Sequence, residues 1–282
     1  MSRSSSLSAA GAASRFALAL SIFCVAAPVI ANAQDAPVCA APAEATGLEH
    51  APMRLRERIA QGLPIKIVAI GSSSTFGSGA TSSAATYPSR LEAELKAQLP
   101  GLPVTVLNKG IGGEEAPQMV ARFAADVIDE SADLVLWQVG SNSVLRDHPT
   151  PGEVIRQGVE RLKESGAEVI LINPQYAPKI LAKADIGHAV DVITATARDE
   201  EVGLFDRFAV MRYWREAERI SFEQFLSPDL LHMNDWSYGC TAKLLATAIL
   251  DGAKLPAATA ILDGVKLPAV TAKVSAAPTA LK

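Results

Sequence analysis

Serine, aspartate and histidine side chains occur in this sequence at spacings that could form a nucleophilic site. Ser73 lies in a Gly/Ser-rich turn directly after an apolar run, and Asp229 and His232 lie three residues apart near the C-terminus. A single helical turn would place that carboxylate beside the imidazole. The carboxylate could then take the Nδ1 proton and leave Nε2 to accept the proton of a serine hydroxyl. These residues predict a serine nucleophile with a histidine base.

Two further residues could bind the oxyanion that forms when a serine attacks a carbonyl carbon. Gly113 lies in a Gly-rich segment and Asn142 follows Gly140-Ser141, each just beyond an apolar run. Backbone N–H groups and a side-chain amide are suitable donors for such an oxyanion. Each residue alone is equally typical of a turn. Their combination at one predicted sheet edge favours the catalytic interpretation.

A Gly/Ser turn after a strand could instead bind phosphate. The turn at 71–79 lacks both the lysine of a P-loop and the Gly-x-Gly-x-x-Gly spacing at the strand exit. The histidines, which are His50, His148, His188 and His232, show no paired spacing typical of a metal site. We therefore expect no metal and no cofactor.

The elements that must position these residues alternate between strand and helix. Apolar runs predict five strands, at 65–70, 103–107, 133–139, 168–172 and 202–205. Helical patterns fall at 53–61, 87–99, 117–129, 151–164, 187–198, 208–218 and 236–250. Several strand runs lack alternation, which is typical of a parallel sheet covered by helices on both faces. Ligands of such doubly wound sheets bind beyond the carboxyl ends of the strands, where Ser73, Gly113 and Asn142 are expected.

Four blocks in this order, at 71–79, 108–113, 140–143 and 229–232, resemble those of the SGNH (GDSL-type) serine hydrolases. The resemblance covers about residues 65–250. It implies an α/β fold, a three-layer α/β/α flavodoxin-like sandwich whose central parallel sheet has about five strands. It also implies that Ser73 is the nucleophile, that Gly113 and Asn142 bind the oxyanion, and that Asp229 and His232 form the Asp-x-x-His pair.

The sequence departs from the pattern of that family at two positions beside the site. Ser72 stands where the family usually has Asp, and Ser143 stands where Asp often follows the asparagine. Neither Ser72 nor Ser143 is at a position that is catalytic in the family. We therefore still expect activity, with altered hydrogen bonding near the site. Three serines follow one another at 72–74, and their register against Gly71 and Thr75 favours Ser73.

The first 33 residues have the features of a secretory signal peptide. Arg3 and Arg15 precede an apolar run at 16–30, which ends in small residues at 31–33. The run has about 15 residues, short of the roughly 20 that span a bilayer. We expect an exported protein, periplasmic or secreted, with no stable membrane span after cleavage.

The rest of the chain divides into three predicted parts. An Ala/Pro-rich lead-in with a short helix covers 34–62, and the catalytic domain covers 63–250. A low-complexity tail follows at 251–282, and its segment 260–269 nearly repeats 248–257. Cys39 and Cys240 remain after signal cleavage, and the sequence leaves open whether they form a disulfide or stay as buried thiols.

Composition excludes some partners. The 282 residues include 26 basic and 30 acidic side chains, a net charge of -4, so nucleic acid is not an expected partner.

The function we expect is an exported serine esterase that cleaves short-chain acyl or acetyl esters through an acyl-enzyme. A small-molecule or polysaccharide ester is the expected partner, and carbohydrate O-deacetylation is the leading substrate hypothesis. An acyltransferase with the same machinery and an inactive carbohydrate-binding protein are the alternatives.

Overall fold

The computed structural model of this chain describes residues 36–253. The predicted signal peptide and nearly all of the predicted tail lie outside the described residues. From Pro37 onward these residues belong to one compact unit.

A five-stranded parallel sheet forms the centre of the fold, with the strand order β2-β1-β3-β4-β5. The strands are β1 (Ile65–Gly71), β2 (Val104–Gly110), β3 (Leu134–Gln138), β4 (Glu168–Ile172) and β5 (Gly203–Phe205). Every residue of β3 is buried, and so is all of β1 except Lys66. This strand order is the flavodoxin-like one, so the predicted sheet is confirmed.

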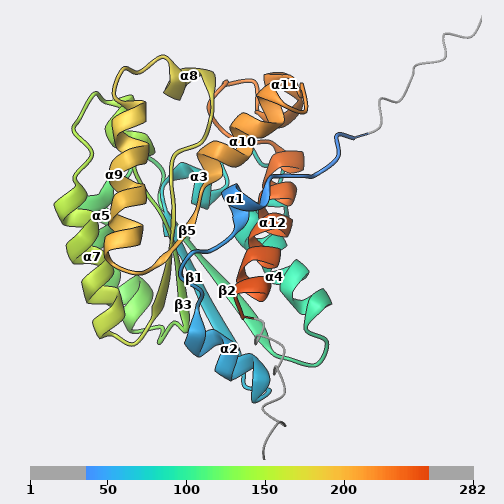
Figure 1. The fold of residues 1–282 in the computed structure, drawn as a ribbon, viewed down its shortest axis with the longest axis vertical. Helices are drawn as coiled ribbons and strands as arrows, with labels where there is room; N and C mark the ends of the chain where they lie inside the picture. The colour runs from blue at the N-terminus through green and yellow to red at the C-terminus, as the bar shows by residue number, and fades with distance from the viewer. Residues whose placement is uncertain (1–35, 254–282) are drawn as a thin grey trace, which may run out of the picture. The chain divides into compact units, whose positions relative to one another are not determined.

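Helices cover both faces of the sheet, as Figure 1 shows. Successive β1 side chains point to opposite faces: Ile67 packs with one helical layer and Val68 with the other. The first layer contains α1 (Ala43–Thr46), α2 (Met53–Ala60), α4 (Tyr87–Gln98), α10 (Arg207–Glu216), α11 (Phe222–Phe225) and α12 (Asp235–Ala253). The second contains α5 (Ala116–Ala121), η2 (Ala124–Ile128), α7 (Gly152–Glu164) and α9 (Ile186–Asp199). The three-layer α/β/α sandwich is therefore confirmed.

Four short helical elements between the strands and the longer helices were not predicted. They are α3 (Ser73–Phe76), η1 (Ser83–Ala85), α6 (Ser141–Leu145) and α8 (Pro178–Leu181). The single helix predicted at 117–129 was wrong in one respect, because it divides into α5 and the π-helical turn η2. Phe123, between the two, is buried edge-to-face against Trp137.

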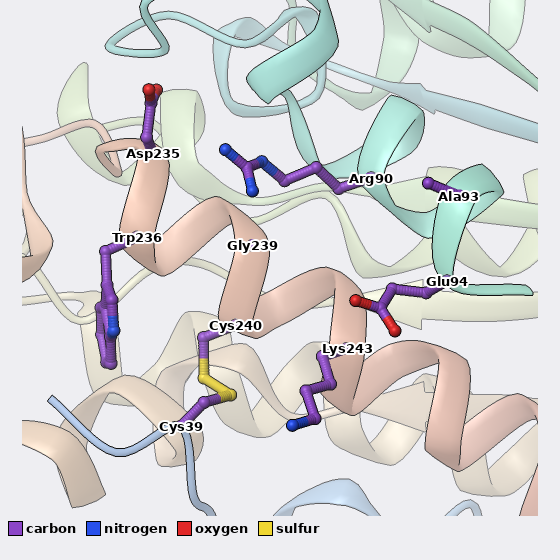
Figure 2. Close-up of a pocket in the computed structure, with 9 residues that line it drawn as sticks. All are labelled: Cys39, Arg90, Ala93, Glu94, Asp235, Trp236, Gly239, Cys240 and Lys243. Atoms are coloured by element: carbon purple, nitrogen blue, oxygen red, sulfur yellow. A yellow bond between two sulfur atoms is a disulfide. The ribbon is translucent and has the colours of Figure 1, made fainter. Parts of the chain in front are cut away.

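The N-terminal lead-in is attached to the helical layer that contains α12. Cys39 and Cys240 form a disulfide, with their Cα atoms 5.4 Å apart, so the alternative of two free thiols was wrong. The indole nitrogens of Trp214 and Trp236 donate to the carbonyl oxygens of Ala40 and Pro37, at 2.8 and 3.0 Å. Figure 2 shows the disulfide among the residues of α4 and α12 that line a surface pocket.

Candidate active site

Ser73 lies at the exit of β1, the strand between β2 and β3. It is the first residue of α3, so the chain turns from strand to helix within two residues. Glycine is required at the end of the strand, because a Cβ on Gly71 would lie 2.2 Å from Oγ1 of Thr75. Ser72 and Ser74 are buried at 2% and 1% exposure, whereas Ser73 is partly exposed. Of the three serines, Ser73 is the one that both faces the surface and contacts a histidine.

That histidine is His232. Its Nε2 lies 2.8 Å from Oγ of Ser73, and its Nδ1 lies 2.5 Å from Oδ2 of Asp229. These contacts fit the neutral imidazole with its proton on Nδ1, where it donates to the carboxylate and leaves Nε2 free to accept from the serine. The three side chains thus form one continuous hydrogen-bonded chain.

Hydrogen bonds hold Asp229 in its ionised form. Partial burial works against ionisation, but the His232 side chain and backbone N–H, the Ser227 hydroxyl and the Leu231 N–H all donate to the carboxylate. Together they hold the pKa of Asp229 well below its usual range. The carboxylate is therefore charged at neutral pH and can orient the imidazole.

The segment that carries Asp229 and His232 is not helical, so the helical turn expected from their spacing was wrong. The segment is instead a tight turn closed by an antiparallel bridge between Leu226 and Met233. Leu230 adopts a left-handed conformation with φ of 55°, which is a strained conformation for a leucine. The Asp229 carboxylate bridges this turn by accepting from the N–H groups of Leu231 and His232.

Close packing holds this turn against the loop that follows α3. A Cβ on Gly79, which has φ of 90°, would lie 2.4 Å from the carbonyl oxygen of Met233 and 3.1 Å from Cβ of His232. The hydroxyl of Tyr238, in α12, donates to the carbonyl oxygen of Ser78 at 2.7 Å. Both contacts fix the histidine segment relative to the serine segment.

Gly113 and Asn142 follow the two strands that flank β1. A Cβ on Gly112 would lie 3.9 Å from Cβ of Ser73, and Gly113 comes next with φ of 84°. Nδ2 of Asn142 donates to the carbonyl oxygen of Glu114 at 2.8 Å, and no residue in the described part of the chain accepts from its second N–H. Between residues 36 and 253, the N–H groups of Ser73 and Gly113 have no hydrogen-bond partner. The segment at 112–113 thus approaches Ser73, and Asn142 is hydrogen-bonded to the residue that follows Gly113.

The two serines that replace expected aspartates have buried side chains with polar partners. Ser72 donates from N and Oγ to Oε1 of Gln138, at 3.0 and 2.9 Å. Ser143 donates to a carboxylate oxygen of Glu115 at 3.3 Å. Sequence reasoning expected altered hydrogen bonding here but identified neither partner. Gln138 was missed because it lies within the apolar strand predicted at 133–139.

A buried polar network continues from Gln138 beneath the site. The Ser141 hydroxyl donates to Oε1 of Gln175 at 2.8 Å, and Nη2 of Arg207 donates to the same oxygen at 3.0 Å. Arg207 is 1% exposed, and burial lowers its pKa to about 10. No carboxylate within the described part of the chain forms an ion pair with it.

Neither a metal cluster nor a membrane span occurs in the described residues. Over 36–253 there is no group of three or more His, Cys, Asp or Glu side chains that could hold a metal ion. Within the same range no helix is both long and apolar enough to cross a membrane.

The sequence places the chain in a family of lipase-like proteins. The model of the Non-GDSL lipase-like family matches residues 38–255, so the chain belongs to that family. The GDSL-type part of the resemblance is not confirmed, because the matched family is described as non-GDSL and the turn reads Gly71-Ser72-Ser73-Ser74. No curated protein matches the chain.

Several solved structures share the fold at low sequence identity. A two-domain esterase (CEX) active on acetylated mannans is 23% identical with a TM-score of 0.65, over 81% of this chain and 60% of that one. A variant of Axe2, an acetyl-xylooligosaccharide esterase from Geobacillus stearothermophilus, is 22% identical with a TM-score of 0.54, over 68% and 94%. LAE5, an alpha/beta hydrolase enzyme from the metagenome of Lake Arreo, Spain, is 22% identical with a TM-score of 0.55, over 68% and 97%. The chain spans less than two thirds of the length of the two-domain esterase. At this level of sequence identity, the three structural similarities establish the shared fold.

Proposed function

We propose that this chain is a serine esterase that removes acetyl or other short acyl groups from carbohydrate, with an SGNH-type active site. The observation that carries the proposal is the hydrogen-bonded chain from Oγ of Ser73 through His232 to Asp229. A serine whose hydroxyl contacts an imidazole oriented by a carboxylate is the arrangement of nucleophilic acyl transfer.

In the first half of the reaction, Oγ of Ser73 bonds to the ester carbonyl carbon while its proton moves to Nε2 of His232. The carbonyl oxygen becomes negative and accepts hydrogen bonds from the N–H groups of Ser73 and Gly113 and from the Asn142 amide. The carbon–alkoxy bond then breaks, and His232 gives its proton to the departing alcohol. The acyl group remains on Ser73 as an ester.

In the second half, water attacks the acyl carbon and gives a proton to His232. The bond to Oγ breaks, His232 returns the proton to Ser73, and the carboxylic acid leaves. Asp229 stays ionised throughout and stabilises the imidazolium that forms in each half. No residue beyond the predicted five is needed for these proton transfers.

The substrate class is inferred from the comparisons. The two-domain esterase acts on acetylated mannans and Axe2 is an acetyl-xylooligosaccharide esterase, so acetylated polysaccharides and oligosaccharides are the class to test first. Export from the cytoplasm is supported by the Cys39–Cys240 disulfide, because such bonds persist in oxidising compartments. We infer a periplasmic or secreted enzyme formed by residues 63–250, after a lead-in at 34–62 and removal of residues 1–33.

The test is release of acetate from acetylated xylo- and manno-oligosaccharides by the protein that begins at Gln34. Acetate release by the wild type and its loss in Ser73→Ala are expected. A folded wild type that binds these oligosaccharides without releasing acetate would favour the inactive binding protein. Acetyl transfer to an added polyol, in place of acetate release, would favour the acyltransferase.

A further inference from the structure

A second group of polar side chains lies beside the proposed oxyanion donors and takes no part in the steps above. Its centre is Glu115, whose carboxylate accepts from Nη1 of Arg146 at 2.6 Å and from Oγ of Ser143 at 3.3 Å. Nδ1 of His148 lies 3.1 Å from the same carboxylate. All three partners come from the segment that follows Asn142, so Glu115 connects the exit of β2 to the exit of β3.

The Glu115 carboxylate is fixed and charged. Its side chain is 13% exposed, and it forms a capping box with Gln118 at the start of α5. Burial opposes ionisation, but the hydrogen bonds from Arg146 and His148 outweigh it and lower the pKa of Glu115. The Arg146 guanidinium is therefore bound to a charged carboxylate whose own position is fixed by the fold.

Glu115 binds one of the two terminal nitrogens of the Arg146 guanidinium, Nη1. No residue in the described range 36–253 accepts a hydrogen bond from Nη2. A Cβ on Gly113 would lie 3.4 Å from this nitrogen, so Nη2 lies close to the glycine assigned to the oxyanion. The Arg146 side chain is 45% exposed, which leaves it accessible to a bound substrate.

We propose that Nη2 of Arg146 binds a hydroxyl oxygen of the sugar that carries the acyl group, and that Glu115 is the residue that positions it. This inference rests on the proposed esterase function. Beyond its carbonyl, an acetyl group has only a methyl, which accepts no hydrogen bond. The carbonyl oxygen already has three proposed donors, so the acceptor for Nη2 is assigned to the alcohol part of the ester.

The charge of the pair indicates which acceptor fits. Glu115 already balances the positive charge of Arg146, and an acidic sugar would bring a second carboxylate toward Glu115. A neutral hydroxyl oxygen avoids that repulsion and still accepts from the guanidinium. The pair therefore selects a neutral acetylated sugar.

The experiment compares two substrates that share the acetyl group and differ in the alcohol. One is a mono-acetylated xylo-oligosaccharide, and the other is p-nitrophenyl acetate, which has no sugar hydroxyl. For Arg146→Ala we expect the ratio of kcat/KM for the sugar ester to kcat/KM for the aryl ester to fall about tenfold, as for one lost hydrogen bond from a charged group. The change should appear mainly in KM, and Arg146→Lys should recover part of the ratio.

Arg156→Ala is the matched control, because its side chain is 40% exposed and forms ion pairs with Glu153 and Glu160 on α7. We expect it to leave the ratio at the wild-type value. Glu115→Gln should lower the ratio in the same direction as Arg146→Ala, through the loss of the anchor. A purely structural role of Glu115 would lower the unfolding midpoint without changing the ratio.

Three outcomes would overturn the inference. Equal loss on both esters in Arg146→Ala would mean that Arg146 acts on the oxyanion or on folding. An unchanged ratio would mean that Nη2 does not contact the sugar. A wild type that cleaves neither ester would overturn the esterase function itself, and this inference with it.

Discussion

Nε2 of His232 lies 2.8 Å from Oγ of Ser73, although 159 positions separate the two residues in the sequence. Packing of the loop after α3 against the turn at 226–233 brings them together, with Gly79 at the contact. The proposed chemistry depends on this contact between the histidine base and the serine nucleophile.

Asn142→Ala should lower kcat by about a hundred- to a thousandfold, because it removes one oxyanion donor. KM should change little, because this donor acts mainly on the charge that develops during the reaction. Steady-state kinetics with p-nitrophenyl acetate measures both constants. The thermal unfolding midpoint serves as the control for loss of the hydrogen bond to Glu114. An unchanged kcat in a folded variant would remove Asn142 from the oxyanion hole.

Asp229→Asn should be less stable than the wild type at neutral pH, by an amount that shrinks in acid. The pKa of Asp229 in the fold lies below the unfolded value of about 3.9, so its charge stabilises the fold above that pH. The contribution is lost as the pH falls through the folded pKa. The effect is modest, because the side chain is 41% exposed. Urea unfolding between pH 7 and pH 2 measures it, and a constant difference over that range would contradict the assignment.

Removing the disulfide should lower the free energy of unfolding by about 2–5 kcal/mol. The bond joins residues 201 positions apart, so in the unfolded chain it closes a long loop. Denaturant unfolding of Cys39→Ala/Cys240→Ala against the oxidised wild type measures the difference. The reduced wild type should agree with the variant. Equal midpoints with and without a reducing agent would show that the bond contributes nothing.

Gly110→Ala should destabilise the fold by about 1–3 kcal/mol and reduce activity. The added Cβ would lie 2.1 Å from the backbone nitrogen of Phe76, which cannot move without displacing α3 and Ser73. Gly187→Ala in α9 is the matched control, because no atom lies within 4 Å of its Cβ position. Gly187 is exposed in the first turn of α9, so the control should keep the wild-type stability to within about 0.5 kcal/mol. Two variants of equal stability would contradict the close packing at Gly110.

The sheet could be predicted from the sequence because continuous apolar runs such as 67–70 and 169–172 are typical of strands buried on both faces. The positions of Ser73, Gly113 and Asn142 beyond three neighbouring strands followed from the same rule. Their catalytic roles stay predictions until the variants are measured.

Other features depend on contacts that a sequence pattern does not contain. The left-handed Leu230 could not be predicted, because a leucine has no local preference for that conformation. Glu115 and Arg146 read as ordinary charged surface residues, and only their approach across two strand exits makes them a pair. The one available signal was their proximity in sequence to Gly113 and Asn142.

The proposed mechanism depends above all on Ser73 as the nucleophile, and covalent labelling can identify the serine that reacts. The folded wild type would be treated with a fluorophosphonate, and the modified peptide would be located by mass spectrometry. We expect one adduct per chain, on Ser73, that is absent from Ser73→Ala and strongly reduced in His232→Ala. An adduct on Ser72 or Ser74, or a folded wild type that takes up no label, would contradict it.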